Sequence, residues 1–167
     1  MYIKVEMKKL ILTLFAAAAV CSGVASTKVI AHRGYWTVPG SAQNSIAALQ
    51  KADSIGCYGS EFDVWMSKDG GLVVNHDGVF KGHDMESSTF AELTAIKLDN
   101  GENLPSLDQY LQAGKKCHTR LILELKAHKD KNRENEAVSK VVEMVKKYGL
   151  EDRVEYISFS LNAVKEL

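Results

Sequence analysis

Two carboxylates lie two residues apart in the short apolar run from Glu61 to Met66, which reads EFDVWM. Side chains at positions i and i+2 of a strand point to the same face, so Glu61 and Asp63 are expected to share one face. Two adjacent acids repel each other unless a positive group lies between them. A hard divalent cation with oxygen ligands is such a group, and the pair therefore predicts a metal site.

A second pair at the same spacing, Glu124 and Lys126, ends another apolar run. Glu124 can give the same cation a third carboxylate, and oxygen ligands favour Ca²⁺ or Mg²⁺ over Zn²⁺ without deciding between the two. Arg33 and Lys126 are expected to add positive charge beside the same carboxylates. A metal beside such groups is one way in which a site holds phosphate.

Two histidines, His32 and His76, lie at or near the ends of apolar runs. Imidazole groups titrate near neutral pH, so the two can serve as a general acid and a general base, in either order. Together with the metal and the two cations, they predict metal-assisted cleavage of a phosphoester. The other histidines, His83, His118 and His128, lie in loops or at strand starts and are interpreted as surface residues.

The elements that carry these residues alternate between strands and helices. The expected strands are 29–31, 58–66, 72–74, 120–126 and 154–160, and the expected helices are about 46–55, 90–96, 107–115, 135–148 and 161–167. This alternation predicts an α/β fold whose parallel strands are joined by helical crossovers. The polar residues lie at the C-terminal ends of strands, where such folds place their sites; for this length an open doubly wound sheet is the default form.

The composition fits one globular domain of 167 residues with a formal net charge of zero. No long basic block occurs, which argues against nucleic acid as a partner. Cys57 and Cys117 lie far apart in the sequence and are expected to be two separate buried thiols.

The first residues predict an export signal. Lys8 and Lys9 precede an apolar run from Leu10 to Val20, and small residues follow it. A bilayer span needs about 20 residues, so the shorter run indicates a signal peptide over residues 1–25 and no stable membrane span. We therefore expect a periplasmic or secreted protein, with the cleavage position left open. Cys21 raises a lipoprotein alternative, but the bulky Val20 before it disfavours that alternative.

A set of short motifs resembles the glycerophosphodiester phosphodiesterase family. The motifs are His32-Arg33-Gly34, Gln43-Asn44-Ser45, Gly59-x-Glu61-x-Asp63-Val64, Lys68-Asp69-Gly70, Val73-Val74-x-His76-Asp77 and Leu123-Glu124-Leu125-Lys126. Ser158-Phe159 resembles a later strand motif of the family, so the similarity runs from about Val29 to Ser160.

The resemblance implies a (β/α)₈ TIM barrel of the phospholipase C-like phosphodiesterase type. It implies hydrolysis of small glycerophosphodiesters to glycerol 3-phosphate and an alcohol that the residues do not identify, within lipid and glycerol metabolism. By the family's pattern, His32 and His76 are the acid/base pair, Glu61, Asp63 and Glu124 bind a divalent cation, Arg33 and Lys126 contact the phosphate, and Asn44 lies near the site.

The chain departs from the family's pattern at a few points. Gln43 stands where the family commonly has Glu, Gly78 where it often has Pro, and the segment after His76-Asp77 is short. A complete barrel takes about 250 residues, whereas only about the first five strands are predicted here. We therefore expect a phosphodiesterase domain over residues 27–167 that is incomplete at its C-terminus and whose activity is a separate question.

Two other functions compete with the phosphodiesterase. One is an inactive fragment, or a pseudoenzyme that only binds phosphate or metal; the presence of both His32 and His76 argues against it, because a binder needs no acid/base pair. The other is a related phosphodiesterase that cleaves phospholipids, for which an apolar lid or membrane-binding loop would be expected and none is seen. The sequence does not predict an oligomeric state.

Overall fold

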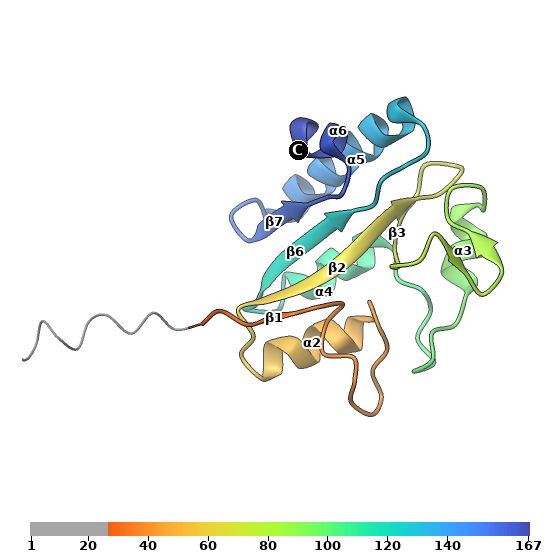
Figure 1. Ribbon diagram of the computed structural model, residues 1–167. Helices are drawn as coiled ribbons and strands as arrows, with labels where there is room; N and C mark the ends of the chain where they lie inside the picture. The colour runs from red at the N-terminus through yellow and green to blue at the C-terminus, as the bar shows by residue number, and fades with distance from the viewer. Residues whose placement is uncertain (1–26) are drawn as a thin grey trace, which may run out of the picture.

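The computed structural model describes residues 27–167, and a five-stranded sheet forms the centre of this part of the chain. The strands are β1 (Ile30–Ala31), β2 (Gly59–Met66), β6 (Arg120–Leu125) and β7 (Val154–Ile157) in that spatial order, with β3 (Leu72–Val74) paired to β2. The four strands β1, β2, β6 and β7 run parallel to one another. Figure 1 shows them crossing the middle of the molecule.

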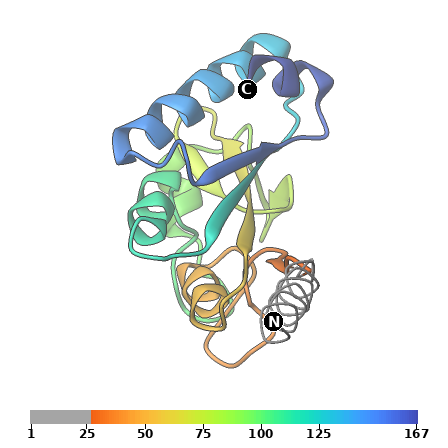
Figure 2. The same ribbon diagram turned by 90° about the vertical axis from the view of Figure 1, so that its left-hand side faces the viewer.

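Helices connect the parallel strands. The described residues form α2 (Ile46–Ser54), α3 (Phe90–Ala95), α4 (Leu107–Gly114), α5 (Lys131–Tyr148) and α6 (Leu161–Glu166), together with a small ribbon of β4 (Val79–Phe80) and β5 (His83–Asp84). Seen from the side in Figure 2, α2, α4 and α5 lie on one side of the sheet. The four parallel strands are thus separated by helices in the manner of part of a TIM barrel, as predicted, whereas β3, β4 and β5 follow β2 without a helix between them.

Local sequence explains where the helices begin and end. Ser45 and Ser106 cap α2 and α4, each by accepting a hydrogen bond from a backbone N–H of the first turn. Asp130 caps α5 in the same way, so this helix begins at Lys131 rather than at residue 135. Gly149 ends α5 in the left-handed conformation, with φ at 65°.

Alternation along β2 and β6 separates two environments. Phe62 of β2 and Leu123 of β6 face the helices and join the main hydrophobic core, where the ring of Tyr110 from α4 stacks on Phe62 with centroids 4.3 Å apart. The residues between these apolar positions point to the opposite face of the sheet. The carboxylates of β2 and β6 therefore lie on the face that the helices do not cover.

The strand β3 differs from the expectation of parallel pairing, because it runs antiparallel to β2, with Val64 opposite Val74 and Met66 opposite Leu72. Residues 67–71 form the whole connection between these strands, which is too short for a helical crossover and allows only a hairpin. The hairpin returns the chain along β2, so that the Asn75 N–H donates to the Asp63 carbonyl at 3.0 Å. His76 consequently lies beside the acidic strand rather than beyond its end.

Some further expectations concern the ends of the chain and the thiols. The signal peptide predicted for residues 1–25 lies outside the described residues. Within residues 27–167, no helix is long and apolar enough to cross a membrane. Cys57 and Cys117 are both free thiols, as predicted, but only Cys117 is buried, whereas Cys57 is partly exposed. The last strand ends at Ile157 rather than at residue 160, because Ser160 caps α6 instead.

Candidate metal centre

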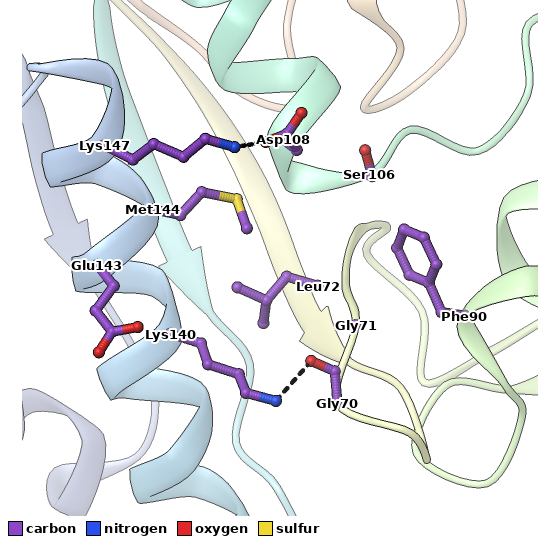
Figure 3. A pocket seen from close by; sticks show the side chains of 10 residues that line it. All are labelled: Gly70, Gly71, Leu72, Phe90, Ser106, Asp108, Lys140, Glu143, Met144 and Lys147. Atoms are coloured by element: carbon purple, nitrogen blue, oxygen red, sulfur yellow. Dashed lines mark hydrogen bonds and ion pairs between the residues drawn. The ribbon is translucent and has the colours of Figure 1, made fainter.

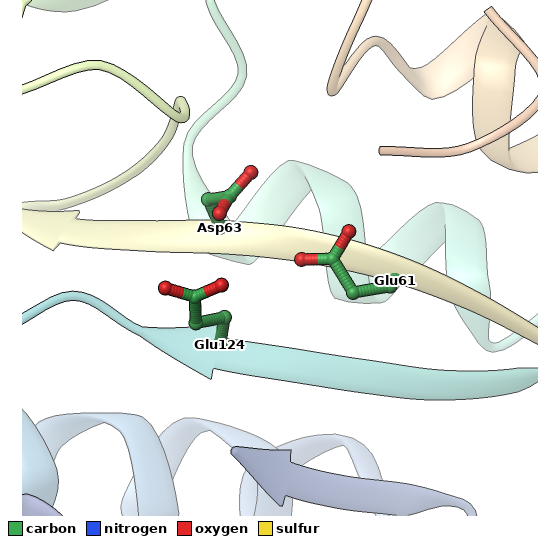
Figure 4. Close-up of side chains that lie close together, drawn as sticks. All are labelled: Glu61, Asp63 and Glu124. Carbon is green, nitrogen blue, oxygen red and sulfur yellow. The ribbon is translucent and has the colours of Figure 1, made fainter. Parts of the chain in front are cut away.

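Three carboxylates converge on the sheet face opposite the helices. Glu61 and Asp63 come from β2 and Glu124 from β6, where Asp63 and Glu124 are direct register partners. One oxygen of each residue lies within 4.8 Å of one oxygen of each of the others, and Figure 4 shows the three side chains close together across the two strands. All three are buried. The structure thus brings the predicted ligands together, through the strand alternation from which they were inferred.

The pKa of Glu61 reflects its burial among other acids. Burial raises the pKa of Glu61 to about 7, the neighbouring charge of Asp63 adds to the effect, and a hydrogen bond from the Arg33 N–H opposes it. That N–H donates to Glu61 Oε2 at 2.8 Å, whereas Oε1 is buried without a hydrogen-bond partner. An unpartnered carboxylate oxygen among acids suits a cation ligand, so the residues present fit a hard divalent cation.

Lys126 supplies the trio with one ammonium group. Its Nζ lies 2.8 Å from Asp63 Oδ1 and 2.8 Å from Glu124 Oε1, and its side chain is largely buried. Burial alone would lower the pKa of Lys126, but the hydrogen bonds to the two carboxylates outweigh burial and raise the pKa above its ordinary value. Lys126, which was predicted to contact the phosphate, therefore places its ammonium between two carboxylates.

Two residues near the acids adopt a left-handed backbone conformation. Arg33 and Asn44 both have φ at 61°, a conformation that costs a residue with a side chain about 1–3 kcal/mol and tends to occur at functional sites. At Arg33 it accompanies the backbone hydrogen bond to Glu61. At Asn44 it accompanies a pair of hydrogen bonds with Asp63, which the prediction that Asn44 lies near the site did not specify.

The guanidinium of Arg33 also reaches the acids, with Nε 4.0 Å from Asp63 Oδ2. Its Nη1 donates to Gln43 Oε1 at 2.7 Å, and Nε is buried without a hydrogen-bond partner. Gln43 thus orients Arg33, a role that sequence reasoning missed. Because the Gln43 amide is neutral, it holds the guanidinium without cancelling the positive charge that a phosphate would need.

The two candidate acid/base residues lie at the rim of the site. His32 Nε2 is 3.8 Å from Glu61 Oε2, and 69% of the His32 side chain is exposed. His76 is half-buried, with Nδ1 2.7 Å from Asp77 Oδ1. Asp77, which directly follows His76 in the chain, therefore orients the His76 ring.

A pocket of about 560 Å³ lies beside Asn44, the hydrogen-bond partner of Asp63. Its lining consists of residues 36–44, residues 75–77, Phe80 and residues 98–100. Asn44, which bonds to Asp63, and His76 both belong to its lining. The pocket therefore connects the neighbourhood of the carboxylates with a candidate base and has the volume of a small-molecule site.

A second pocket, of about 450 Å³, contains none of the predicted site residues. Figure 3 shows its lining: Gly70, Gly71, Leu72, Phe90, Ser106, Asp108, Lys140, Glu143, Met144 and Lys147. Its lysines are already paired with acids, since Lys147 Nζ lies 2.6 Å from Asp108 Oδ1 and Lys140 Nζ lies 2.8 Å from Glu136 Oε1. This pocket therefore offers no free charge for a phosphate.

The interpretation of His128 as a surface residue is wrong, because the structure buries it. Its Nε2 accepts a hydrogen bond from the Met66 N–H at 3.1 Å, so Nδ1 carries the proton and donates to the Lys126 carbonyl at 2.8 Å. Burial lowers the pKa of His128, which keeps the ring neutral. His128 thus ties the ends of β2 and β6 together beside Lys126. Its place two residues after Lys126 is the one sequence signal for this role. His118, by contrast, is fully exposed.

Comparison with known proteins supports the same interpretation. The model of the glycerophosphoryl diester phosphodiesterase family matches residues 32–167. The crystal structure of a glycerophosphodiester phosphodiesterase from Parabacteroides distasonis is 51% identical, with a TM-score of 0.84 over 86% of this chain and 61% of that chain. An Oleispira antarctica phosphodiesterase, solved in complex with the product sn-glycerol-3-phosphate, is 29% identical, with a TM-score of 0.71 over 84% of this chain and 60% of that one.

A curated relative is a member of the same family. A glycerophosphodiester phosphodiesterase from Caldanaerobacter subterraneus subsp. tengcongensis is 34% identical over 161 residues, which cover 84% of this chain and 63% of that protein. This chain therefore spans about three fifths of the length of the relatives that it matches.

Proposed function

This chain belongs to the glycerophosphoryl diester phosphodiesterase family, and we propose that its acidic site hydrolyses glycerophosphodiesters to glycerol 3-phosphate and an alcohol. The observation that carries the proposal is the convergence of Glu61, Asp63 and Glu124 within 4.8 Å of one another. Lys126 and Arg33 lie beside these acids, so ligands for a cation and cations for an anion occur in one place.

The residues of the chain position the phosphate. A divalent cation, Ca²⁺ or Mg²⁺, held by Glu61, Asp63 and Glu124 would supply positive charge that polarises a phosphoryl oxygen. Arg33 adds a guanidinium whose buried Nε has no hydrogen-bond partner and can therefore donate to a phosphate oxygen. Lys126, which directly follows β6, adds an ammonium.

The two histidines move the protons. With Nδ1–H directed to Asp77, His76 presents Nε2 as a base that takes a proton from the attacking water. His32, near Glu61, gives a proton to the oxygen of the departing alcohol as the bond between phosphorus and that oxygen breaks. Overall, one water is consumed, its oxygen forms a bond to phosphorus, and the bond from phosphorus to the alcohol oxygen breaks. His76 gains the proton that the water loses, His32 loses the proton that the alcohol gains, and both histidines return to their starting states by proton exchange with solvent.

We further propose that the protein acts outside the cytoplasm. The support is the order of basic, apolar and small residues before residue 27. Fractionation of cells that produce the whole chain tests this: a shortened species in the periplasm or the medium supports export, and a full-length species that stays in the cytoplasm contradicts it.

The hydrolysis itself is tested with the purified chain, glycerophosphocholine as substrate and an assay for released glycerol 3-phosphate in the presence of Ca²⁺ or Mg²⁺. We expect Glu124→Gln to lower the rate by about a hundredfold or more, because it removes one charged ligand. Glu143→Gln is the matched control, since Glu143 is an exposed acid at the other pocket. No release by the wild type, or equal rates for the two variants, would contradict the proposal; metal binding without release would favour a binding module instead.

A further inference from the structure

The ammonium of Lys126 lies between two of the carboxylates that are candidate metal ligands, 2.8 Å from Asp63 Oδ1 and 2.8 Å from Glu124 Oε1. We propose that Lys126 is a resident cation that closes the metal site while it is empty, and that binding of a divalent cation releases its ammonium for the phosphate. This inference rests on the proposed metal site and concerns the regulation of that site.

The charges in the site make the ammonium a partial substitute for a metal. Among the described residues, the Lys126 ammonium is the one positive group within 3 Å of any of the three buried carboxylates, since the Arg33 guanidinium lies 4.0 Å from Asp63. Glu61 Oε1 remains without a hydrogen-bond partner although its side chain is 94% buried. A divalent cation would satisfy Glu61 as well as the two oxygens that Lys126 now holds, so it competes for them with an advantage in charge.

Lys126 is also the member of the cluster that is able to leave. Glu61, Asp63 and Glu124 are fixed by paired strands, and Asn44 holds the Asp63 carboxylate independently of Lys126. The ammonium ends a flexible stem of four methylene groups and can rotate away while the carboxylates stay in place. Metal binding would thus change the position of one charge and leave the ligand geometry intact.

The first test is calorimetric titration of Ca²⁺ and Mg²⁺ into the whole chain without substrate. Lys126→Gln removes the competing ammonium, and we expect it to bind the metal at least about tenfold more tightly than the wild type. Arg33→Gln is the matched control, because it also removes a positive side chain near Asp63. The Nε of Arg33 lies 4.0 Å from Asp63 Oδ2, farther than the 2.8 Å between Lys126 Nζ and Asp63 Oδ1. If Lys126→Gln binds metal no more tightly than Arg33→Gln, Lys126 does not occupy the site and the proposal fails.

The second test uses the wild type and so does not depend on a variant that folds. Acetylation of lysines, followed by mass spectrometry, compares the protein in chelator with the protein in saturating Ca²⁺. We expect Ca²⁺ to raise the labelling rate of Lys126 about tenfold, inorganic phosphate added with Ca²⁺ to lower it again, and the exposed Lys129 to stay unchanged. Unchanged labelling of Lys126 while Ca²⁺ binds, or failure of Ca²⁺ to bind, overturns the proposal. Neither test requires turnover, so an inactive chain that passes both would contradict only the proposed hydrolysis.

Discussion

Asn44 and Asp63 are joined by two hydrogen bonds of opposite direction. Asn44 Nδ2 donates to Asp63 Oδ2 at 2.8 Å, and the Asp63 N–H donates to Asn44 Oδ1 at 3.2 Å. Both residues are buried, and Asn44 precedes α2 in a left-handed conformation. The loop after β1 therefore orients a carboxylate of β2 through hydrogen bonds within the protein, which is a form of preorganisation.

Replacement of Asn44 tests this orientation. Asn44→Ala removes both hydrogen bonds and places alanine in left-handed backbone, so we expect a loss of about 2–4 kcal/mol in the free energy of unfolding. Asn44→Gly removes the same bonds without the backbone strain and should lose about 1 kcal/mol less. Urea denaturation measures the stabilities, and calorimetry should show weaker Ca²⁺ binding in both variants. A glycine variant that binds Ca²⁺ like the wild type would show that Asn44 does not orient Asp63.

Glu61 makes the stability of the metal-free protein depend on pH. Its pKa in the folded state, about 7, lies above the ordinary value of 4.5, so the protonated form favours folding. The stabilisation is complete below about pH 4.5 and is lost as the pH rises through about 7. Glu61→Gln cannot ionise, and at pH 8 in chelator we expect it to be about 2–3 kcal/mol more stable than the wild type. Denaturation at pH 5 and pH 8 measures the difference, and an equal difference at both values would contradict the assignment.

His76 and its partner Asp77 are expected to affect the rate more than the stability. His76→Ala removes the proposed base and should lower kcat by about 10²–10⁴, whereas Asp77→Asn, which only loosens the ring, should cost about tenfold. His118→Ala is the control, because 99% of the His118 side chain is exposed. Steady-state kinetics with glycerophosphocholine measure these effects. Full activity in His76→Ala would remove this residue from the mechanism.

His128 is expected to stabilise the ends of β2 and β6. His128→Phe keeps much of the ring volume beside Trp65 but leaves the Met66 N–H and the Lys126 carbonyl unpaired, which should cost about 1–3 kcal/mol. Burial lowers the pKa of His128, so the stability that it contributes is complete above pH 6.5 and falls as the pH drops. The deficit of the variant, measured by denaturation against a His118→Phe control, should therefore shrink at acidic pH. A deficit independent of pH would contradict a neutral, buried ring.

The acidic trio was predictable because it depends on the strictest regularity of a strand. Glu61 and Asp63 share a face by alternation, and Glu124 joins them because β2 and β6 pair in parallel register. The apolar residues between them then had to face the helices. Local rules therefore determined both the core side and the chemical side of these two strands.

Other features depend on contacts between segments distant in sequence. Gln43 bonds to Arg33 and His128 to Met66, and neither partner follows from spacing along the chain. The antiparallel pairing of β3 was within reach of sequence reasoning, because a connection over residues 67–71 cannot hold a crossover helix. The alternation of strands and helices elsewhere led to the expectation of a parallel strand at that point.

Glu61, Asp63 and Glu124 are proposed to hold a divalent cation that the hydrolysis requires. The most direct measurement is the rate at which the purified chain releases glycerol 3-phosphate from glycerophosphocholine after dialysis against chelator, before and after Ca²⁺ or Mg²⁺ is restored. We predict that chelation reduces the rate to background and that one or both cations restore it. Hydrolysis that continues unchanged in chelator would contradict the claim.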